Sequence, residues 1–216
     1  RLLADTFQVA TLSRGYKRKS EGFVLANEFT VMEDIGDEPF QYYSKFKNIH
    51  VAVDANRVIG VTNILKQKSD TQVVILDDAF QHRKIKAGFY ILLTSYDELY
   101  FNDCLLPAGN LRESSIGVKR ADVVVVTKCP PNLSSAEQQN IRSKIKSENV
   151  FFSTIVYDEN ISNDSTILNL KTFTDSFVAL AGIAKPQFFF NYLKCDAMNT
   201  LTFPDHHNFT DSDIQT

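Results

Sequence analysis

Two observations predict an α/β fold in which helices flank a parallel sheet. Short apolar runs alternate along the chain with segments whose apolar residues recur at helical spacing. The apolar runs are also uninterrupted, whereas a strand with one solvated face would alternate apolar and polar residues. The clearest run is residues 73–76, Val-Val-Ile-Leu, which we expect to form a strand buried on both faces.

Five stretches are predicted as strands of the first domain, each bounded by polar or turn-forming residues. They are residues 7–12, 49–53, 73–76, 89–94 and 123–126. Because strands alternate with helical segments, we expect them to run parallel, with their carboxyl ends at one edge of the sheet. Ligands of open parallel sheets bind outside that edge.

Three helices are predicted around these strands from capping signals and periodicity. The first opens at Gly36-Asp37-Glu38-Pro39, since proline favours the first helical position and a preceding acid can cap free N–H groups. The second follows Asp54, and the third opens at Ser134 with Glu137 three residues later, which is a capping-box signature. In the first helix Phe40, Tyr43 and Phe46 recur at helical spacing and are expected to face the core. The second helix places Val58, Val61 and Leu65 on one face, and Ile141 and Ile145 continue the third.

A change in composition predicts a domain boundary near residue 150. Residues 157–174 are rich in Asn, Asp, Ser and Thr and are predicted to be a connector. Residues 177–181 are then expected to form a buried strand that turns into a helix. Residues 1–150 would thus form the α/β core, and residues 151–216 a linker and the start of a second, smaller α/β domain. The residues expected to face inward from the last helix are Phe189, Phe190 and Leu193.

Two adjacent acids, Asp77 and Asp78, follow the strand at residues 73–76 directly. Phosphotransferases with a P-loop hold Mg²⁺ at such a strand end, opposite their phosphate cradle. A solvated acidic turn would also explain two acids, but Gln81 and His82 follow at once and crowd four polar, reactive side chains into one turn. Enzymes with an aspartyl nucleophile, and many metal-dependent glycosyltransferases, use D-x-D spacing instead. We therefore predict a magnesium site at the acid pair.

Three cations and one further acid stand at the ends of predicted elements. Arg14, in a basic loop after the first strand, is the cation best placed to meet an anion. Arg112, in the loop before the last strand of the core, could neutralise phosphate charge or pair on the surface. Lys128 ends that strand, where P-loop proteins often contact the nucleotide base. Helix capping alone would explain Asp37, so a catalytic role is the alternative interpretation.

The composition is that of an ordinary globular protein, with 44% hydrophobic and 23% charged residues among 216. The net charge of −3 argues against a nucleic-acid partner. No apolar run approaches the ~20 residues that a membrane span requires. Cys104, Cys129 and Cys195 are scattered without C-x-x-C spacing, which fits reduced thiols in a cytosolic protein.

Six short motifs follow one another along the chain. They are L-S-R-G-Y at residues 12–16, G-D-E-P at 36–39, D-D-A-F-Q-H at 77–82, L-P-A-G-x-L-R-E at 106–113, A-G-I-A-x-P at 181–186 and F-P-D-H-H at 203–207. In this order they resemble the tetraacyldisaccharide 4′-kinase family, the lipid A 4′-kinases of Gram-negative bacteria. The resemblance implies a P-loop-NTPase-like core and a cleft between two α/β domains.

The activity implied by this resemblance is transfer of the γ-phosphoryl group of ATP to the 4′-hydroxyl of a tetraacyldisaccharide 1-phosphate. Asp37 and His206 would together remove the proton of the sugar hydroxyl, and Asp205 would orient the histidine. Arg112 would meet phosphate charge. The partners implied are ATP, the lipid A disaccharide precursor and the inner membrane, on whose cytoplasmic face the enzyme would be peripheral.

The remaining site residues implied by the resemblance bind the cofactors, ATP and Mg²⁺. Asp77 and Asp78 would hold Mg²⁺ directly or through water, and Glu113 would assist. The residues that would contact the nucleotide are Arg14, Gln81, His82 and Lys128.

The chain departs from the family's pattern in its extent. The family's P-loop, G-x-x-x-x-G-K-[ST], would precede Phe7, and the second domain would continue beyond Thr216, so we expect a fragment that is inactive by itself. Two alternatives stay open: another P-loop phosphotransferase acting on a soluble substrate, and a catalytically inactive nucleotide-binding module. A zinc site at His206 and His207 is a further alternative, although adjacent histidines rarely bind one ion.

Overall fold

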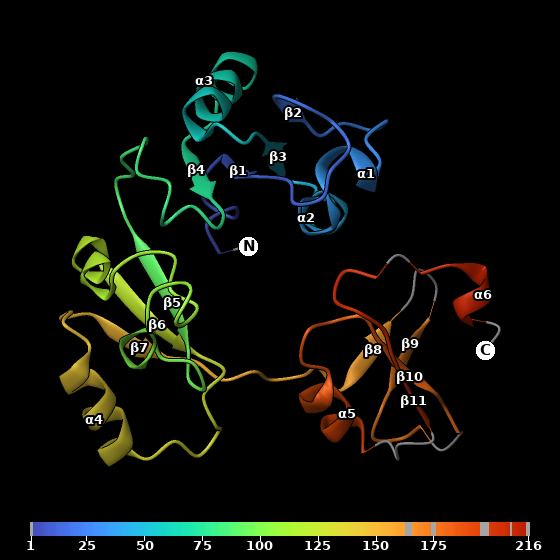
Figure 1. The fold of residues 1–216 in the computed structure, drawn as a ribbon. Coiled ribbons are helices and arrows are strands. Elements are labelled where there is room, and N and C mark those ends of the chain that lie inside the picture. Colours follow the sequence, from blue (N-terminus) through green and yellow to red (C-terminus); the bar gives the residue numbers. More distant parts are fainter. Residues whose placement is uncertain (1, 163–165, 174–175, 195–198, 208, 215–216) are drawn as a thin grey trace. The chain divides into compact units, whose positions relative to one another are not determined.

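The computed structural model describes residues 2–162, 166–173, 176–194, 199–207 and 209–214. The chain divides into two compact units, Arg1–Ile155 and Val156–Thr216. Figure 1 shows that strands and helices alternate along most of the first unit and recur in the second. The predicted α/β fold class is therefore confirmed for the described residues.

The first unit begins with a four-stranded sheet in the order β2-β3-β1-β4. Strand β1 (Val9–Ser13) lies parallel to both β3 (Ile49–Val53) and β4 (Val73–Leu76), as predicted. The short strand β2 (Val24–Leu25) adds to β3 in the antiparallel direction and was not predicted. The carboxyl ends of three parallel strands therefore share one edge.

Three helices accompany this sheet: α1 (Met32–Ile35), α2 (Asp37–Lys45) and α3 (Arg57–Gln67). Helix α2 begins at Asp37, so Pro39 is its third residue rather than its first, and the N-cap is Gly36. Gly36 has φ +89°, and a Cβ on it would lie 2.8 Å from the Tyr16 carbonyl oxygen. Glycine is thus required where α2 begins against the loop after β1.

The predicted face of α3 is buried only in part, since Val61 packs against the core but its two companions do not. Val58 and Leu65 are 42% and 46% exposed, whereas Gly60 and Ile64 are buried against the sheet. A Cβ on Gly60 would lie only 2.7 Å from the Leu12 side chain, so the missing side chain lets α3 approach β1 closely. Periodicity pointed to the larger apolar residues because it cannot detect a close approach that needs glycine.

A second sheet in the first unit has the order β5-β6-β7, and all three strands are parallel. It contains β5 (Ile91–Ser95), β6 (Val123–Thr127) and β7 (Val150–Phe152). The accompanying helices are α4 (Ser135–Lys144), capped by the predicted Ser134, and the 3₁₀ turns η1 (Tyr100–Asn102) and η2 (Ser115–Arg120). Ile141 and Ile145 lie in the core of this part.

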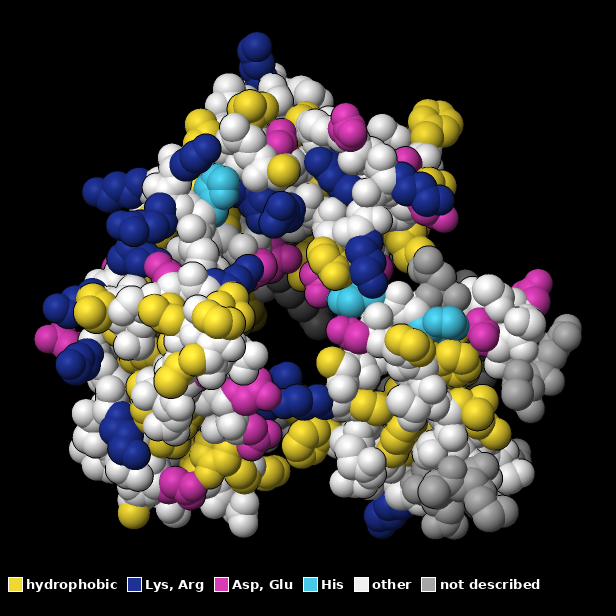
Figure 2. Space-filling view, viewed as in Figure 1, with side chains coloured by type: hydrophobic (Ala, Val, Ile, Leu, Met, Phe, Trp, Pro, Cys, Tyr) yellow, Lys and Arg dark blue, Asp and Glu magenta, His cyan; other side chains and the backbone are white. Residues whose placement is uncertain are grey.

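Burial on both faces was predicted for β4, and it is wrong there; β5 is exposed in the same way. Ile75 in β4 is 41% exposed, and Ile91 and Leu93 in β5 are 55% and 64% exposed. Both strands lie at the edges of their sheets within the described chain, so neighbours cover them incompletely. Figure 2 shows hydrophobic side chains at the surface over the part of the molecule that carries β5–β7.

The second unit contains a small β-α-β arrangement. Strands β10 (Ala179–Ala181) and β11 (Thr200–Thr202) are parallel, and α5 (Gln187–Leu193) lies between them in the chain. Phe190 is buried with Ala179 and Ala181, and Phe189 and Leu193 pack against them, as predicted for this helix. A short helix, α6 (Asp211–Ile214), follows.

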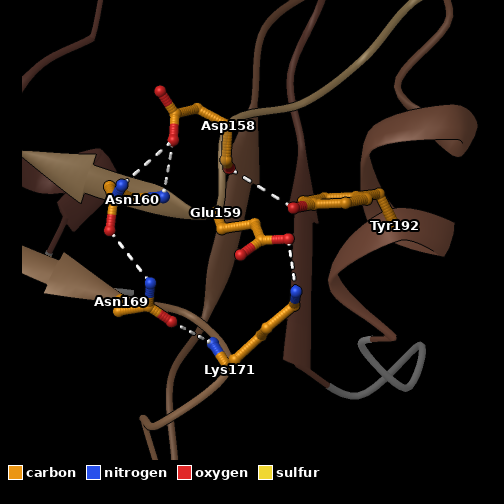
Figure 3. A network of polar contacts seen from close by, with 6 residues as sticks. All are labelled: Asp158, Glu159, Asn160, Asn169, Lys171 and Tyr192. Atoms are coloured by element: carbon orange, nitrogen blue, oxygen red, sulfur yellow. Dashed lines mark hydrogen bonds and ion pairs between the residues drawn. The ribbon is translucent and has the colours of Figure 1, made fainter.

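The predicted connector at residues 157–174 contains a two-stranded antiparallel sheet, which was not predicted. Strands β8 (Asn160–Ser162) and β9 (Ile167–Asn169) pair in register. Polar side chains of this segment form hydrogen bonds and an ion pair with one another and with α5 (Figure 3). The polar residues therefore stabilise a folded segment. The contacts are Asn169 to Asn160, Asn160 to Asp158, Lys171 to Glu159 and the Tyr192 hydroxyl of α5 to the Asp158 carbonyl.

Within the described segments, none of the helices has the length and apolar character needed to cross a bilayer.

We expect the protein to lose stability between pH 7.5 and pH 5.5, in part through His50 on β3. Burial lowers the pKa of the His50 imidazole below its usual value of 6.5, and Lys68 lowers it further, while Asp70 acts in the opposite direction. The unfolded chain therefore binds the proton first as the pH falls through about 6.5, and folding becomes less favourable. Thermal unfolding at both pH values measures the loss. The variant His50→Gln should shrink the difference in Tm, and an unchanged difference would contradict the assignment.

Candidate active site

The carboxyl edge of the first sheet gathers residues that are distant in sequence. The backbone N–H of Asp54 donates to the Ser13 carbonyl (3.0 Å), and that of Asp77 donates to the Leu12 carbonyl (3.0 Å). The ends of β1, β3 and β4 are thus joined directly by backbone hydrogen bonds. Ser13 and Asp54 are buried there, at 8% and 5% exposure.

The acid pair projects from this edge in a strained turn. Asp78 has φ +42°, a left-handed conformation that is uncommon outside glycine. Arg112 donates through Nη2 to Asp78 Oδ1 (3.1 Å) and to Gln81 Oε1 (3.1 Å). The structure therefore brings together three predicted site residues from two motifs. Both partners of the ion pair are exposed, at 57% for the Arg112 side chain and 75% for Asp78.

His82 lies in the same turn, and its backbone N–H donates a hydrogen bond to the Ala79 carbonyl oxygen (2.8 Å). Its Nε2 is buried and has no hydrogen-bond partner among the described residues. Burial lowers the pKa of the His82 imidazole, and the positive charges of Arg57 and Lys84 lower it further. A neutral imidazole with an unsatisfied nitrogen is suited to a polar ligand at this edge.

Glu113, predicted to assist the metal, is paired with Arg120. Arg120 Nη2 lies 2.6 Å from Glu113 Oε1 and also donates to the Phe80 carbonyl (3.2 Å), and the guanidinium stacks 4.6 Å from the centre of the Phe80 ring. Arg120 thereby connects the loop of Arg112 to the acid turn. Sequence reasoning missed Arg120, because nothing in its spacing from Glu113 distinguishes it from a surface arginine.

Arg14 lies in the loop after β1 and Asp37 at the start of α2, and these two segments are in contact. A Cβ on Gly36 would contact the backbone of Gly15 and Tyr16, so the helix that begins with Asp37 packs against the loop that contains Arg14. Asp37 Oδ1 accepts from the N–H of Glu38 (2.8 Å), a contact that any carboxylate at a helix start could make. The geometry alone thus accommodates both the capping and the catalytic interpretation of Asp37.

Tyr42 on α2 is a residue of this edge that sequence reasoning missed. Burial raises the pKa of its hydroxyl, and the negative charge of Asp77, the charge of Glu38 and a hydrogen bond to the Asp77 carboxylate raise it further. Tyr42 and Asp77 also line one cavity of about 560 Å³, whose other walls are mainly apolar. In the sequence, Tyr42 is one of several aromatic residues of the same helix. Nothing in the sequence therefore distinguishes it as a site residue.

Lys128 is exposed in the turn after β6, with φ +57°. It belongs to the edge of the second sheet, at the carboxyl end of a parallel strand, as predicted.

The second unit holds the two histidines of F-P-D-H-H, and each faces a different acid. His206 Nε2 lies 3.7 Å from Asp205 Oδ2, and His207 Nε2 lies 3.1 Å from Asp213 Oδ2. His207 also stacks on the Phe203 ring, with centroids 4.6 Å apart. His207 therefore holds the F-P-D-H-H segment in place through contacts with nearby residues. No group of three or more metal-ligating side chains occurs in the part of the chain that the structure describes.

A sequence model of the family described as tetraacyldisaccharide-1-P 4′-kinase matches residues 1–216, which is the whole chain. The chain belongs to this family. The resemblance of the six motifs is thereby confirmed.

Curated members of the tetraacyldisaccharide-1-P 4′-kinase family are similar to the chain along its entire length. A tetraacyldisaccharide 4′-kinase of Flavobacterium johnsoniae is 57% identical over 219 residues, covering 100% of this chain and 64% of that protein. One of Bacteroides thetaiotaomicron is 42% identical and is covered over 61% of its length. The chain thus spans less than two thirds of these relatives.

A solved structure supports the same assignment. The crystal structure of the "apo" form of LpxK from Aquifex aeolicus in complex with ATP has a TM-score of 0.75 to this chain and 29% sequence identity. The similarity covers 97% of this chain and 67% of that one. The fold of the described chain is therefore that of a tetraacyldisaccharide-1-P 4′-kinase.

The side chains at the carboxyl edge fit the magnesium ion that such a kinase requires. Mg²⁺ is held in proteins by one or two carboxylates, with waters and substrate phosphates completing its shell. Asp77 and Asp78 supply two hard oxygen donors at one strand end, and Asp78 is open to solvent. A third protein carboxylate is not needed, so the pairing of Glu113 with Arg120 does not remove the site.

Proposed function

We propose that the protein to which this chain belongs transfers the γ-phosphoryl group of ATP to the 4′-hydroxyl of tetraacyldisaccharide 1-phosphate, a step of lipid A biosynthesis. The observation that carries this proposal is the family match over the whole chain, with the acid pair of that family at the carboxyl edge of a parallel sheet. Ligands of such sheets bind at this edge.

The chain's residues divide the work as follows. Asp77 and Asp78 hold Mg²⁺, which when bound neutralises charge on the transferring phosphoryl group. Arg112, an exposed donor in contact with Asp78, is within reach of anions that bind there and can exchange its carboxylate partner for a phosphate oxygen. Gln81, next to it, orients that guanidinium through its side-chain oxygen.

The remaining nucleotide contacts come from three residues. Arg14, exposed after β1, supplies a positive charge for phosphate oxygens, and His82 supplies its unsatisfied Nε2 to a polar group of the nucleotide, while Lys128 contacts the base from the end of β6. Glu113 assists the metal indirectly, since Arg120 holds it beside the acid turn.

Asp37 and His206 remove the proton of the attacking hydroxyl. Asp205, 3.7 Å from the imidazole, orients His206. A carboxylate beside an imidazole selects its tautomer and orientation, which suits an imidazole that acts as a base.

A substrate with four acyl chains resides in a membrane, so the enzyme acts as a peripheral protein on the cytoplasmic face of the inner membrane. Co-sedimentation of the full-length protein with vesicles of anionic phospholipid checks this. Protein that stays in the supernatant at every lipid concentration would contradict it.

The activity is tested with the full-length protein, γ-labelled ATP and purified tetraacyldisaccharide 1-phosphate in detergent. We expect label in the lipid product, and none when EDTA removes Mg²⁺. A parallel reaction uses the same disaccharide phosphate without acyl chains. Equal transfer to the deacylated acceptor would indicate a kinase of soluble substrates, and ATP binding without transfer to either acceptor would indicate an inactive nucleotide-binding module.

A further inference from the structure

Arg57, at the start of α3, is a buried arginine at the carboxyl edge that the roles above do not use. Only 3% of it is exposed. Arginine is rarely buried to this extent unless it is paired or hydrogen-bonded, because removing a charge from water is costly. Its surroundings should therefore show what the guanidinium does.

The guanidinium bridges two turns of the edge. Nη1 donates to the carbonyl oxygens of Asp54 (2.9 Å) and Ala55 (3.3 Å), in the turn after β3. Nη2 donates to the carbonyl oxygen of Asp77 (3.4 Å), the first of the acid pair. Nε is buried without a partner among the described residues. Arg57 thus donates to backbone oxygens and does not occupy the carboxylates of the acid pair, whose side-chain contacts come from Tyr42 and Arg112.

Charges nearby compensate for the burial of Arg57. Burial lowers its pKa, and the positive charge of Arg14 lowers it further, whereas Asp78, Asp77 and Asp54 raise it. Arginine has so high an intrinsic pKa that it keeps its charge in such a place. The fixed positive charge of Arg57 near the carboxylates of Asp77 and Asp78 offsets the repulsion between these two acids.

The contact with Asp77 has a specific consequence for Asp78. The Asp77 carbonyl belongs to the peptide group that also carries the N–H of Asp78, and the N–H of Asp77 is held by the Leu12 carbonyl (3.0 Å). Both backbone groups of Asp77 are therefore anchored. Asp78 follows with φ +42°, and strained conformations of this kind persist only where surrounding contacts hold them.

We propose that Arg57 is a positioning residue for the acid pair: its guanidinium holds the Asp77 carbonyl and so presets the turn in which Asp77 and Asp78 bind Mg²⁺. This deepens the proposed function and rests on it for the identity of the metal. The role is positional, since Arg57 contacts backbone oxygens and not the reacting groups.

The first test measures the turn itself, by hydrogen–deuterium exchange of the full-length protein. In Arg57→Gln we expect faster exchange in peptides that cover residues 77–82 and in the turn after β3 whose carbonyls Arg57 also holds, with the body of α3 and the strands of the first sheet unchanged. Faster exchange confined to α3, together with a lower Tm, would show that Arg57 only stabilises its helix and would overturn the proposal. This readout does not depend on kinase activity.

The second test measures the Mg²⁺ concentration that gives half-maximal phosphoryl transfer. Residues that orient metal ligands typically change metal affinity by about 10-fold to 100-fold, so Arg57→Gln should raise this concentration by that factor while leaving the KM of the lipid unchanged. Lys66→Gln removes an exposed positive charge from the last turn of the same helix and should change neither quantity. An unchanged Mg²⁺ requirement in Arg57→Gln would also overturn the proposal.

The variant Arg57→Lys keeps the charge but not the forked donors, and we expect the same changes in exchange and in Mg²⁺ requirement. If Arg57→Gln fails to fold, both measurements are made on Arg57→Lys. Wild-type behaviour of the lysine variant would show that a positive charge is enough to hold the turn, and would contradict a role for the guanidinium donors. If the wild-type protein transferred no phosphate, the proposed function would fail, whereas the exchange of residues 77–82 would still decide the positioning role.

Discussion

Asp77→Ala and Asp78→Ala are each expected to abolish Mg²⁺-dependent transfer in the full-length protein, by on the order of a thousandfold or more in kcat. The factor corresponds to the several kcal/mol of transition-state stabilisation that a correctly placed metal ion supplies. Excess Mg²⁺ should restore little activity, since the position of the metal matters and not only its presence. Initial rates of labelled lipid formation over a range of Mg²⁺ concentrations measure the loss.

The fold should survive both substitutions. Alanine retains the backbone contacts of Asp77 with Leu12 and Arg57 and removes only the hydrogen bond between its carboxylate and Tyr42, and the Asp78 side chain is 75% exposed. Asp70→Ala is the matched control, because Asp70 is an exposed acid in the turn before the same strand, at the opposite end from the site. Unfolding of either site variant would show that the acids are structural, and near-wild-type turnover would remove their metal role.

Alanine substitution of Asp37 or His206 is expected to lower kcat by about 10²–10⁴-fold, the usual contribution of a positioned general base. The double variant should lose little more than either single variant, because two residues that act as one base cannot be removed twice. The two residues belong to different compact units, so kinetics of the full-length protein decides this prediction.

Two further variants sharpen that experiment. Asp205→Asn should reduce kcat less than His206→Ala, since it removes orientation of the imidazole and not the imidazole itself. His50→Gln changes a histidine on the first sheet and should leave kcat unchanged. Additive losses in the double variant would mean that Asp37 and His206 act separately, with Asp37 limited to the helix-start contact seen at Glu38.

Local sequence signals predicted the main elements of the fold well. The strands near residues 9–13, 49–53, 73–76 and 123–127 and the helix capped by Ser134 are present because their apolar runs and capping residues act over a few neighbouring residues. The burial of β4 on both faces was predicted wrongly, since burial depends on which neighbours a strand has and not on its own residues. The hairpin β8–β9 was missed because its stabilising contacts, such as Tyr192 to Asp158, join residues distant in sequence.

The sequence by itself determined the residue types of the site and their order: an acid pair at a strand end, a guanidinium in a later loop and a histidine beside an acid. Only the tertiary structure decided how they are held. Arg112 meets Asp78 across 34 residues, and Arg57 reaches Asp77 because Gly60 lets its helix approach β1. Strand and helix signals are local, whereas a buried charge acquires its role from backbone groups that the fold brings to it.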